Sequence, residues 1–293
     1  MSDEGATPGD IAPGIMTEYL TDDWGLFVRS SQPIARFRSQ YQDVEVHDSQ
    51  PFGKLFRLDG HFMTSERDEF FYHETLVHIA GLAHPGPERA LVVGGGDGGS
   101  ADELLKYPSM RSVTIAEIDA AVIEISRQHF EAVHHGALDD PRVALRIEDG
   151  FRFVQQTHER FDLIVLDLTD PGGPSTSLYT PEFYAACATR LTSGGAMTMH
   201  IGSPVAHPSR VGGALQELRR AFPRVTPYLT SIPLYGGLWM MACCSTSLDP
   251  RRQSAATIDL RISQRRLAQL QFVNGETYRA ALALPNFVRA LVA

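Results

Sequence analysis

Two carboxylates lie three residues apart near the middle of the chain, directly after an apolar segment. Residues 161–166 form the kind of apolar run that makes a buried strand, and Asp167 and Asp170 come just after it. In open α/β sheets, ligands bind outside the carboxyl ends of the strands. A pair of acids in that position suits a cationic substrate, or a base that removes a proton from the substrate.

A glycine-rich loop follows an earlier apolar run. It fits the pattern G-x-G-x-x-G at Gly94, Gly96 and Gly99, between an expected strand and an expected helix. Glycines let the backbone turn tightly and lie close to a nucleotide. Asp97 inside the loop argues against a dinucleotide, because a carboxylate would repel a pyrophosphate. The loop therefore suits a ligand with a cationic centre.

Two further strand ends deliver acids to the same edge. Glu117 lies about twenty residues past the glycines, where an acid binds ribose hydroxyls, and Asp119 is expected to cap the next helix. Asp149, before Gly150, can accept from an exocyclic amine such as that of adenine, or cap the following helix, or do both. The acids at this edge of the sheet predict a ligand-binding crevice for a nucleoside that carries a sulfonium group, rather than for a dinucleotide. The additional acids predict that the group acceptor is an amine.

These strand ends can meet only if the strands belong to one sheet. From residue 89 onward, segments with a strand pattern alternate with segments with a helical pattern, which is typical of such a sheet. The expected strands cover residues 90–93, 112–118, 143–147, 161–166 and 195–201, and the expected helices between them cover 99–106, 120–130 and 150–156. This order predicts an α/β fold: a Rossmann-like, doubly wound, mostly parallel sheet of the class I methyltransferase type. The tail predicts helices over 252–270 and 275–292.

The part before residue 89 has a different pattern. Residues 1–15 are rich in Gly, Pro and Asp and are expected to be a disordered lead-in. Residues 16–64 predict a small antiparallel β domain of short strands with turns between them. Ser65, with an acid three residues on, predicts the start of a helix that runs to about residue 81. Residues 65–293 then form the expected catalytic domain.

Composition excludes several classes of protein. The chain has 293 residues and a formal net charge of −9, which argues against a nucleic-acid partner. Its apolar runs are shorter than the ~20 residues of a membrane span. Its three cysteines form no disulfide framework, so we expect reduced thiols in a cytoplasmic protein. His134 and His135 lack converging partners in the sequence, and no metal site is expected.

The residues resemble the spermidine synthases, which are polyamine aminopropyltransferases. The resemblance covers about residues 19–290, and its motifs follow in the family's order. They are LDG at 58–60, ERDEFFYHE at 66–74, the glycine loop at 94–99, EID at 117–119, DG at 149–150, DLTDPGGP at 167–174, IPLY at 232–235 and ALP at 283–285. The resemblance implies decarboxylated S-adenosylmethionine as donor, putrescine as acceptor, no cofactor, and a homodimer or homotetramer built partly by the N-terminal domain.

The resemblance also implies roles for the acids and for the residues around them. Asp167 would be the general base, Asp170 would hold the ammonium of the substrate, and Asp97 would bind an amine of the donor or acceptor. A carboxylate of ordinary pKa, ~4, is a weak base for an amine of pKa ~10, so its help should come from orientation. The other implied contacts are Tyr72 and His73 in the substrate channel, Tyr235 at the acceptor end, and, at the donor nucleoside, Gln42, Gly94, Gly96, Glu117, Asp149, Gly150 and Pro174.

Two departures from the family pattern concern the acceptor end. The loop after Tyr235 is one residue shorter than usual, and His200 stands where the family commonly has Gln. A cationic imidazole there would oppose a polyamine. The acceptor therefore stays open among putrescine, cadaverine, 1,3-diaminopropane and spermidine.

Three other functions compete with aminopropyl transfer. An S-adenosylmethionine-dependent methyltransferase would share the glycine loop, but Asp97 would repel its donor's carboxylate. A non-catalytic polyamine-binding homologue would not need all of the acids that the reaction requires, and this chain has all of them. A nicotinamide dehydrogenase is opposed by Asp97.

Overall fold

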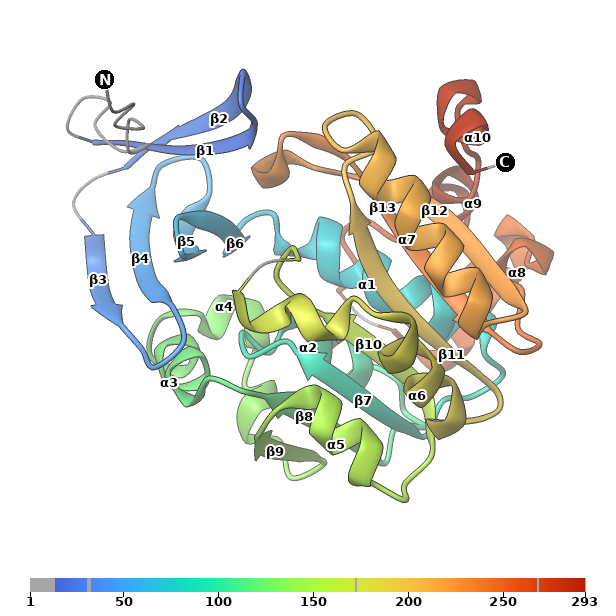
Figure 1. Ribbon diagram of the computed structural model, residues 1–293. Coiled ribbons are helices and arrows are strands. Elements are labelled where there is room, and N and C mark those ends of the chain that lie inside the picture. The colour runs from blue at the N-terminus through green and yellow to red at the C-terminus, as the bar shows by residue number, and fades with distance from the viewer. Residues whose placement is uncertain (1–13, 31–32, 172, 268, 293) are drawn as a thin grey trace.

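The computed structural model describes residues 14–30, 33–171, 173–267 and 269–292. The expected lead-in lies outside these residues as far as residue 13. Figure 1 shows a small strand-rich part in blue at the N-terminal side and a larger α/β part around one central sheet. Among the described helices, none is both long and apolar enough to span a membrane.

The N-terminal part consists of two antiparallel units. A two-stranded hairpin joins β1 (Ile15–Thr21) to β2 (Trp24–Arg29). A four-stranded meander follows in sequence order, with β3 (Pro33–Arg38), β4 (Asp43–Ser49), β5 (Gly53–Leu58) and β6 (His61–Ser65). One face of this meander packs apolar side chains on two helices of the larger part, α3 (Ala120–His129) and α4 (Glu131–His134).

The central sheet has seven strands in the order β12-β13-β11-β10-β7-β8-β9. Five of them are parallel, and β13 pairs antiparallel with both β11 and β12. Their bounds are β7 Arg89–Gly94, β8 Ser112–Glu117, β9 Val143–Ile147, β10 Phe161–Asp167, β11 Leu191–Gly202, β12 Arg224–Ile232 and β13 Gly237–Ser245. The Rossmann-like, doubly wound sheet expected from the sequence is confirmed.

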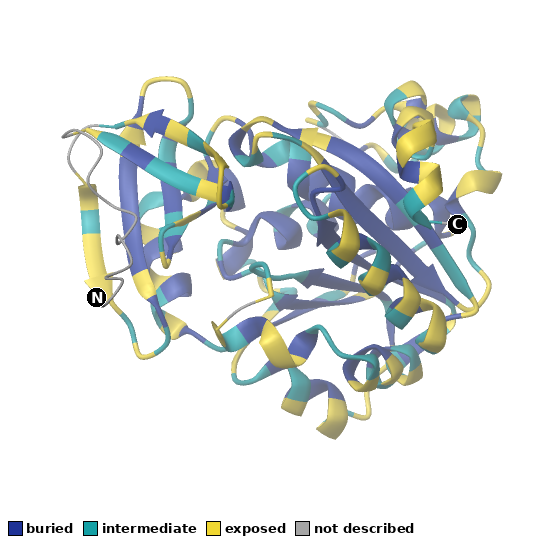
Figure 2. Cartoon of the chain, turned by 45° about the horizontal axis from the view of Figure 1, so that its top comes forward, coloured by how far each residue is buried: buried dark blue, intermediate teal, exposed yellow. Residues whose placement is uncertain are grey.

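Helices cover both faces of this sheet, because side chains alternate between the faces along each strand. Along β7, Ala90 and Val92 pack against one layer, whereas Leu91 and Val93 pack against the other. The first layer holds α3 with α1 (Glu69–Ala83), α2 (Gly99–Leu105), α8 (Ala255–Arg265) and α9 (Gly275–Ala281). The second holds α5 (Gly150–Gln156), α6 (Pro181–Arg190), α7 (Pro208–Ala221) and α10 (Asn286–Val292). Figure 2 shows the sheet as the most continuously buried element.

Several sequence-based boundaries were wrong. The helix expected over residues 252–270 covers only Ala255–Arg265, and the strand expected from residue 195 begins at Leu191. Ser65 does not cap α1, because it still belongs to β6, and its hydroxyl donates to Asp68, the residue before the helix. The tail beyond residue 275 is two short helices, since Pro285 lacks the N–H that a continuous helix needs at that point.

Candidate active site

Two adjoining cavities open at the carboxyl ends of the parallel strands, next to the N-terminal strands. The first, of about 120 Å³, lies over β7, β8 and β10, and the second, of about 340 Å³, extends toward β1, β6 and α7. They share Tyr72, Tyr235 and the loop residues Leu168 and Thr169. The sheet edge expected to bind ligands thus faces a cavity at each of its acidic strand ends.

The structure brings all of the predicted site residues to these two cavities. Asp170 lines only the second cavity. The first is lined by the other twelve, namely Gln42, Tyr72, His73, Gly94, Gly96, Asp97, Glu117, Asp149, Gly150, Asp167, Pro174 and Tyr235. Parallel strand ends converge at one edge, and this is why residues so far apart in the chain meet here.

Asp167 ends β10, and its carboxylate is nearly buried. The Ser100 hydroxyl donates a 2.7 Å hydrogen bond to its Oδ2 atom. Burial, together with the nearby negative charge of Asp97, raises the pKa of Asp167 to about 6, although His73, Ser100 and Tyr72 oppose this rise. The structure therefore makes Asp167 a stronger base than an ordinary carboxyl group.

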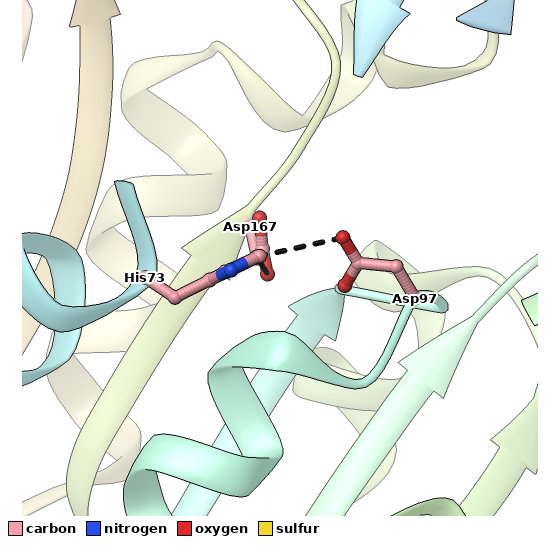
Figure 3. A group of neighbouring side chains, drawn as sticks. All are labelled: His73, Asp97 and Asp167. Carbon is pink, nitrogen blue, oxygen red and sulfur yellow. Dashed lines mark ion pairs between the residues drawn. The ribbon is translucent and has the colours of Figure 1, made fainter. Parts of the chain in front are cut away.

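His73 projects from α1 toward the glycine loop and lies between three carboxylates. Its Nδ1 is 2.7 Å from Glu69, one turn earlier, and its Nε2 is 3.4 Å from Asp97 and 3.9 Å from Asp167. Figure 3 shows the imidazole beside Asp97 and Asp167. Burial opposes a charge on the ring, but Asp97, Glu69 and Asp167 outweigh it and raise the pKa of His73 well above its ordinary value. His73 is therefore held as a cation.

The positive charge on His73 also governs Asp97. Burial alone would raise the pKa of Asp97, but the charge and hydrogen bonding of His73 bring it below its usual value. His73, Asp97 and Asp167 are the one group of described side chains that is spaced closely enough to hold a metal ion. In the absence of a metal, the imidazole lies 3.4 Å from Asp97 and 3.9 Å from Asp167 as an ion-pair cluster.

The acid at the end of β8 sits in a small network. Glu117 is buried and accepts from the backbone N–H of Asp119, and burial raises its pKa to about 7. Asp119 accepts from Ala121 N–H and caps α3 as expected. Gln42, in the turn between β3 and β4, donates a 3.1 Å bond to Asp119, so that part of the chain helps to close the first cavity. Asp149 both lines the cavity and caps α5 through Arg152 N–H.

The loop after Tyr235 keeps this side chain in the site despite being short. Tyr235 ends a 3-10 turn (Pro233–Tyr235), its hydroxyl donates to the Met63 carbonyl, and its ring meets the ring of Tyr72 edge-on at 5.9 Å. The two glycines that follow both have positive φ. That backbone conformation lets the chain reverse at once into β13, since glycine adopts it without strain.

Comparisons with known proteins agree with this geometry. The spermine/spermidine synthase domain matches residues 69–253, and the spermidine synthase tetramerisation domain matches residues 18–66. A polyamine aminopropyltransferase of Nitrosomonas europaea is 45% identical over 291 residues, which is 99% of this chain and 90% of the relative. The chain belongs to the spermine/spermidine synthase family.

Other members of the family extend the similarity to structure. A polyamine aminopropyltransferase of Bacillus mycoides is 35% identical over 94% of this chain and 98% of its own. A crystal structure of a spermidine synthase in complex with the transition-state analogue AdoDATO superposes with a TM-score of 0.89 at 33% identity, and covers 95% of this chain and 94% of that one. The expected family, fold and transferase class are confirmed, and these relatives favour aminopropyl transfer over methyl transfer.

Sequence reasoning missed three residues that act on the site. Glu69 could have been found, because it lies four residues before His73 on the same helix face. Ser100 directly follows the glycine loop, but its bond to Asp167 needs β7 beside β10. Arg210 pairs with Asp170 at 2.8 Å, and no local pattern announces a contact across forty residues.

Proposed function

We propose that this chain transfers the aminopropyl group of decarboxylated S-adenosylmethionine to putrescine, giving spermidine and methylthioadenosine, and needs no metal or other cofactor. The observation that carries the proposal is Asp167, a nearly buried base of raised pKa beside the junction of two cavities. One cavity suits a nucleoside, and the other suits a chain-like amine. The structural relative that binds AdoDATO supports the same class of donor.

In the proposal, the first cavity holds the donor nucleoside. Glu117 accepts hydrogen bonds from the ribose hydroxyls once it is ionised, as an acid at the second strand end does in related folds. Asp149 and the backbone of Gly150 face the adenine, and Pro174 covers it. The remaining contacts are with Gln42, Gly94 and Gly96.

The reaction is a single displacement at the propyl carbon attached to sulfur. The lone pair of the putrescine nitrogen forms the new C–N bond, while the electrons of the C–S bond go to sulfur and leave neutral methylthioadenosine. The nitrogen loses its extra proton to Asp167, whose raised pKa narrows the gap to an amine. Most of the acceleration comes from holding the neutral amine in line with the carbon.

The side chains around Asp167 stabilise the positive charges of the two substrates, and none of them takes the proton that Asp167 removes. Asp97 faces an amine of the donor or acceptor, and the His73 cation keeps Asp97 ionised. The rings of Tyr72 and Tyr235 form walls of both cavities and guide the methylene chain. Asp170 lines the far part of the second cavity, where the second ammonium of a diamine would lie.

We also propose that residues 16–64 form an oligomerisation domain that joins four copies of the chain, with residues 65–293 as the catalytic domain. The support is the match of residues 18–66 to a tetramerisation domain, and large apolar side chains exposed on β2 and β3. Phe27 is 65% exposed and Ile34 is 45% exposed. Exposed apolar groups on edge strands are typical of contact surfaces. Sedimentation of the wild type and of Phe27→Glu would test the assembly.

The decisive experiment is a product analysis. Purified protein is incubated with putrescine and either decarboxylated S-adenosylmethionine or S-adenosylmethionine, and the products are identified by mass spectrometry. We expect an aminopropylated product with the first donor only. A methylated amine, or no turnover of the decarboxylated donor, would overturn the proposal.

A further inference from the structure

The far part of the second cavity contains an ion pair that the proposed reaction does not need. Arg210, in the first turn of α7, places its Nη2 atom 2.8 Å from Oδ2 of Asp170. Both side chains are partly exposed to the cavity, at 28% for Arg210 and 40% for Asp170. The carboxylate that would receive the second ammonium of a diamine thus already has a cationic partner.

Room for Arg210 comes from a glycine at the end of β11. Gly202 has φ of +101°, and a Cβ atom built there would lie 2.3 Å from Nη2 of Arg210. The register of β11 against β13 also shifts between His200 and Gly202. Any side chain at position 202 would take the space that the guanidinium occupies. The lack of a side chain at position 202 therefore leaves the guanidinium room to reach Asp170.

His200 is not the cation at this end of the cavity. Its Nε2 is 2.7 Å from the Leu168 carbonyl, which can only accept, so Nε2 carries the proton. Its Nδ1 accepts from the indole N–H of Trp239 at 3.3 Å, and burial lowers the pKa of His200. The ring is thus neutral. The sequence suggested that a cationic His200 would repel a polyamine. In the structure, Arg210 is the cation that would do so.

A second carboxylate, that of Glu18, lines the second cavity and already accepts hydrogen bonds from the protein. Its two oxygens accept from Phe62 N–H at 2.7 Å and from His61 at 3.2 Å. Oδ1 of Asp170 is buried 3.7 Å from Nδ1 of His200, and neither this atom nor the buried Nε of Arg210 has a hydrogen-bond partner among the described residues. At this end of the cavity, Asp170 is therefore a carboxylate already shared with a guanidinium, rather than a free one.

We propose that Arg210 determines acceptor selection by competing with the far ammonium of the amine substrate for Asp170. The inference rests on the proposed function, in which an amine enters the second cavity. An acceptor with a second ammonium must share Asp170 with a guanidinium, whereas an acceptor that ends in a hydroxyl or a methyl group does not. Arg210 thus lowers the preference of the site for diamines over monoamines of the same length.

The test compares three acceptors of equal chain length: putrescine, 4-amino-1-butanol and butylamine. We expect Arg210→Gln to lower the KM for putrescine about two- to fivefold, the size suited to a partly exposed pair. The KM values for the two monoamines should change much less, and the effect should fall on KM rather than kcat. Arg210→Met, which removes the charge and the polar end of the side chain, should show the same difference between acceptors.

A binding measurement separates this proposal from the reaction itself. Calorimetric titration of putrescine into protein saturated with methylthioadenosine should show the same gain in affinity in Arg210→Gln. Arg220→Gln is the matched control, because Arg220 lies on the same helix but pairs with Glu217 at the surface. An unchanged or weaker affinity for putrescine, or an equal change for all three amines, would overturn the proposal. Failure of the wild type to turn over any amine would instead count against the proposed function.

Discussion

The hydroxyl of Ser100 donates a 2.7 Å hydrogen bond to Oδ2 of Asp167. Ser100 lies in the first turn of α2, and Asp167 ends the neighbouring strand β10, so the bond joins two of the acidic strand ends. A hydrogen bond donated to a carboxylate stabilises its charged form. Ser100 therefore offsets part of the effect of burial, which raises the pKa of Asp167 to about 6.

The first prediction concerns pH. Because Asp167 must be ionised to accept a proton, and its pKa is raised to about 6, kcat/KM should fall as the pH drops through about 6. Ser100→Ala removes a bond that favours the ionised form, so the acid limb of the profile should move upward by roughly half to one pH unit. Ser109→Ala is the control, since that hydroxyl bonds the Pro87 carbonyl away from the site. An unshifted limb in Ser100→Ala would exclude Asp167 as the titrating base.

The second prediction concerns the base itself. Asp167→Asn should lower kcat by about 10²- to 10⁴-fold, the usual contribution of a positioned general base. Binding of methylthioadenosine should survive, because the nucleoside contacts lie on other strand ends. We also expect a thermal midpoint at pH 8 no lower than that of the wild type, since the fold loses stability as the pH rises from the ordinary carboxyl pKa of 3.8 to about 6, and this loss is complete at pH 8. Turnover within a few fold of the wild type would refute the assignment.

The third prediction concerns the donor. The pKa of Glu117 is raised to about 7, so affinity for methylthioadenosine should rise between pH 6 and pH 8 as the carboxylate becomes able to accept from the ribose hydroxyls. Glu117→Gln should weaken binding at pH 8 by about ten- to a hundredfold and remove most of the pH dependence. Calorimetry with Glu148→Gln serves as the control, because Glu148 lines neither cavity. A pH dependence preserved in Glu117→Gln would assign it to another group.

The fourth prediction concerns the packing of His73. A Cβ atom on Gly99 would lie 2.3 Å from the imidazole, which Glu69 holds in place. Gly99→Ala should destabilise the fold by about 1–3 kcal/mol and impair turnover, because the buried ring must shift. Gly213→Ala, at an exposed position of α7 with no atom near the new Cβ, should leave activity intact and gain up to about 1 kcal/mol. Thermal unfolding and steady-state kinetics of both variants test this prediction. Wild-type stability and turnover in Gly99→Ala would contradict it.

The sequence by itself determined the parallel sheet and the acids at its edge. Apolar runs of strand length between helical patterns located β7 to β11, and each acid followed a run directly, so local order alone placed Asp97, Glu117, Asp149 and Asp167 at strand ends. The glycine loop was equally local, since a tight strand-to-helix turn depends on neighbouring residues. The resemblance to a family then supplied the roles.

Only the tertiary structure decided which side chains of the site are charged and which side chain pairs with Asp170 at the far end of the second cavity. The raised pKa of Asp167 and the protonation of His73 depend on burial and on carboxylates from separate segments, which no local pattern records. The neutral state of His200 needed Trp239 and the Leu168 carbonyl beside it. Arg210 reaches Asp170 because α7 packs beside the end of β11 and Gly202 leaves it space. Long-range contacts therefore set the electrostatics, whereas short-range periodicity set the scaffold.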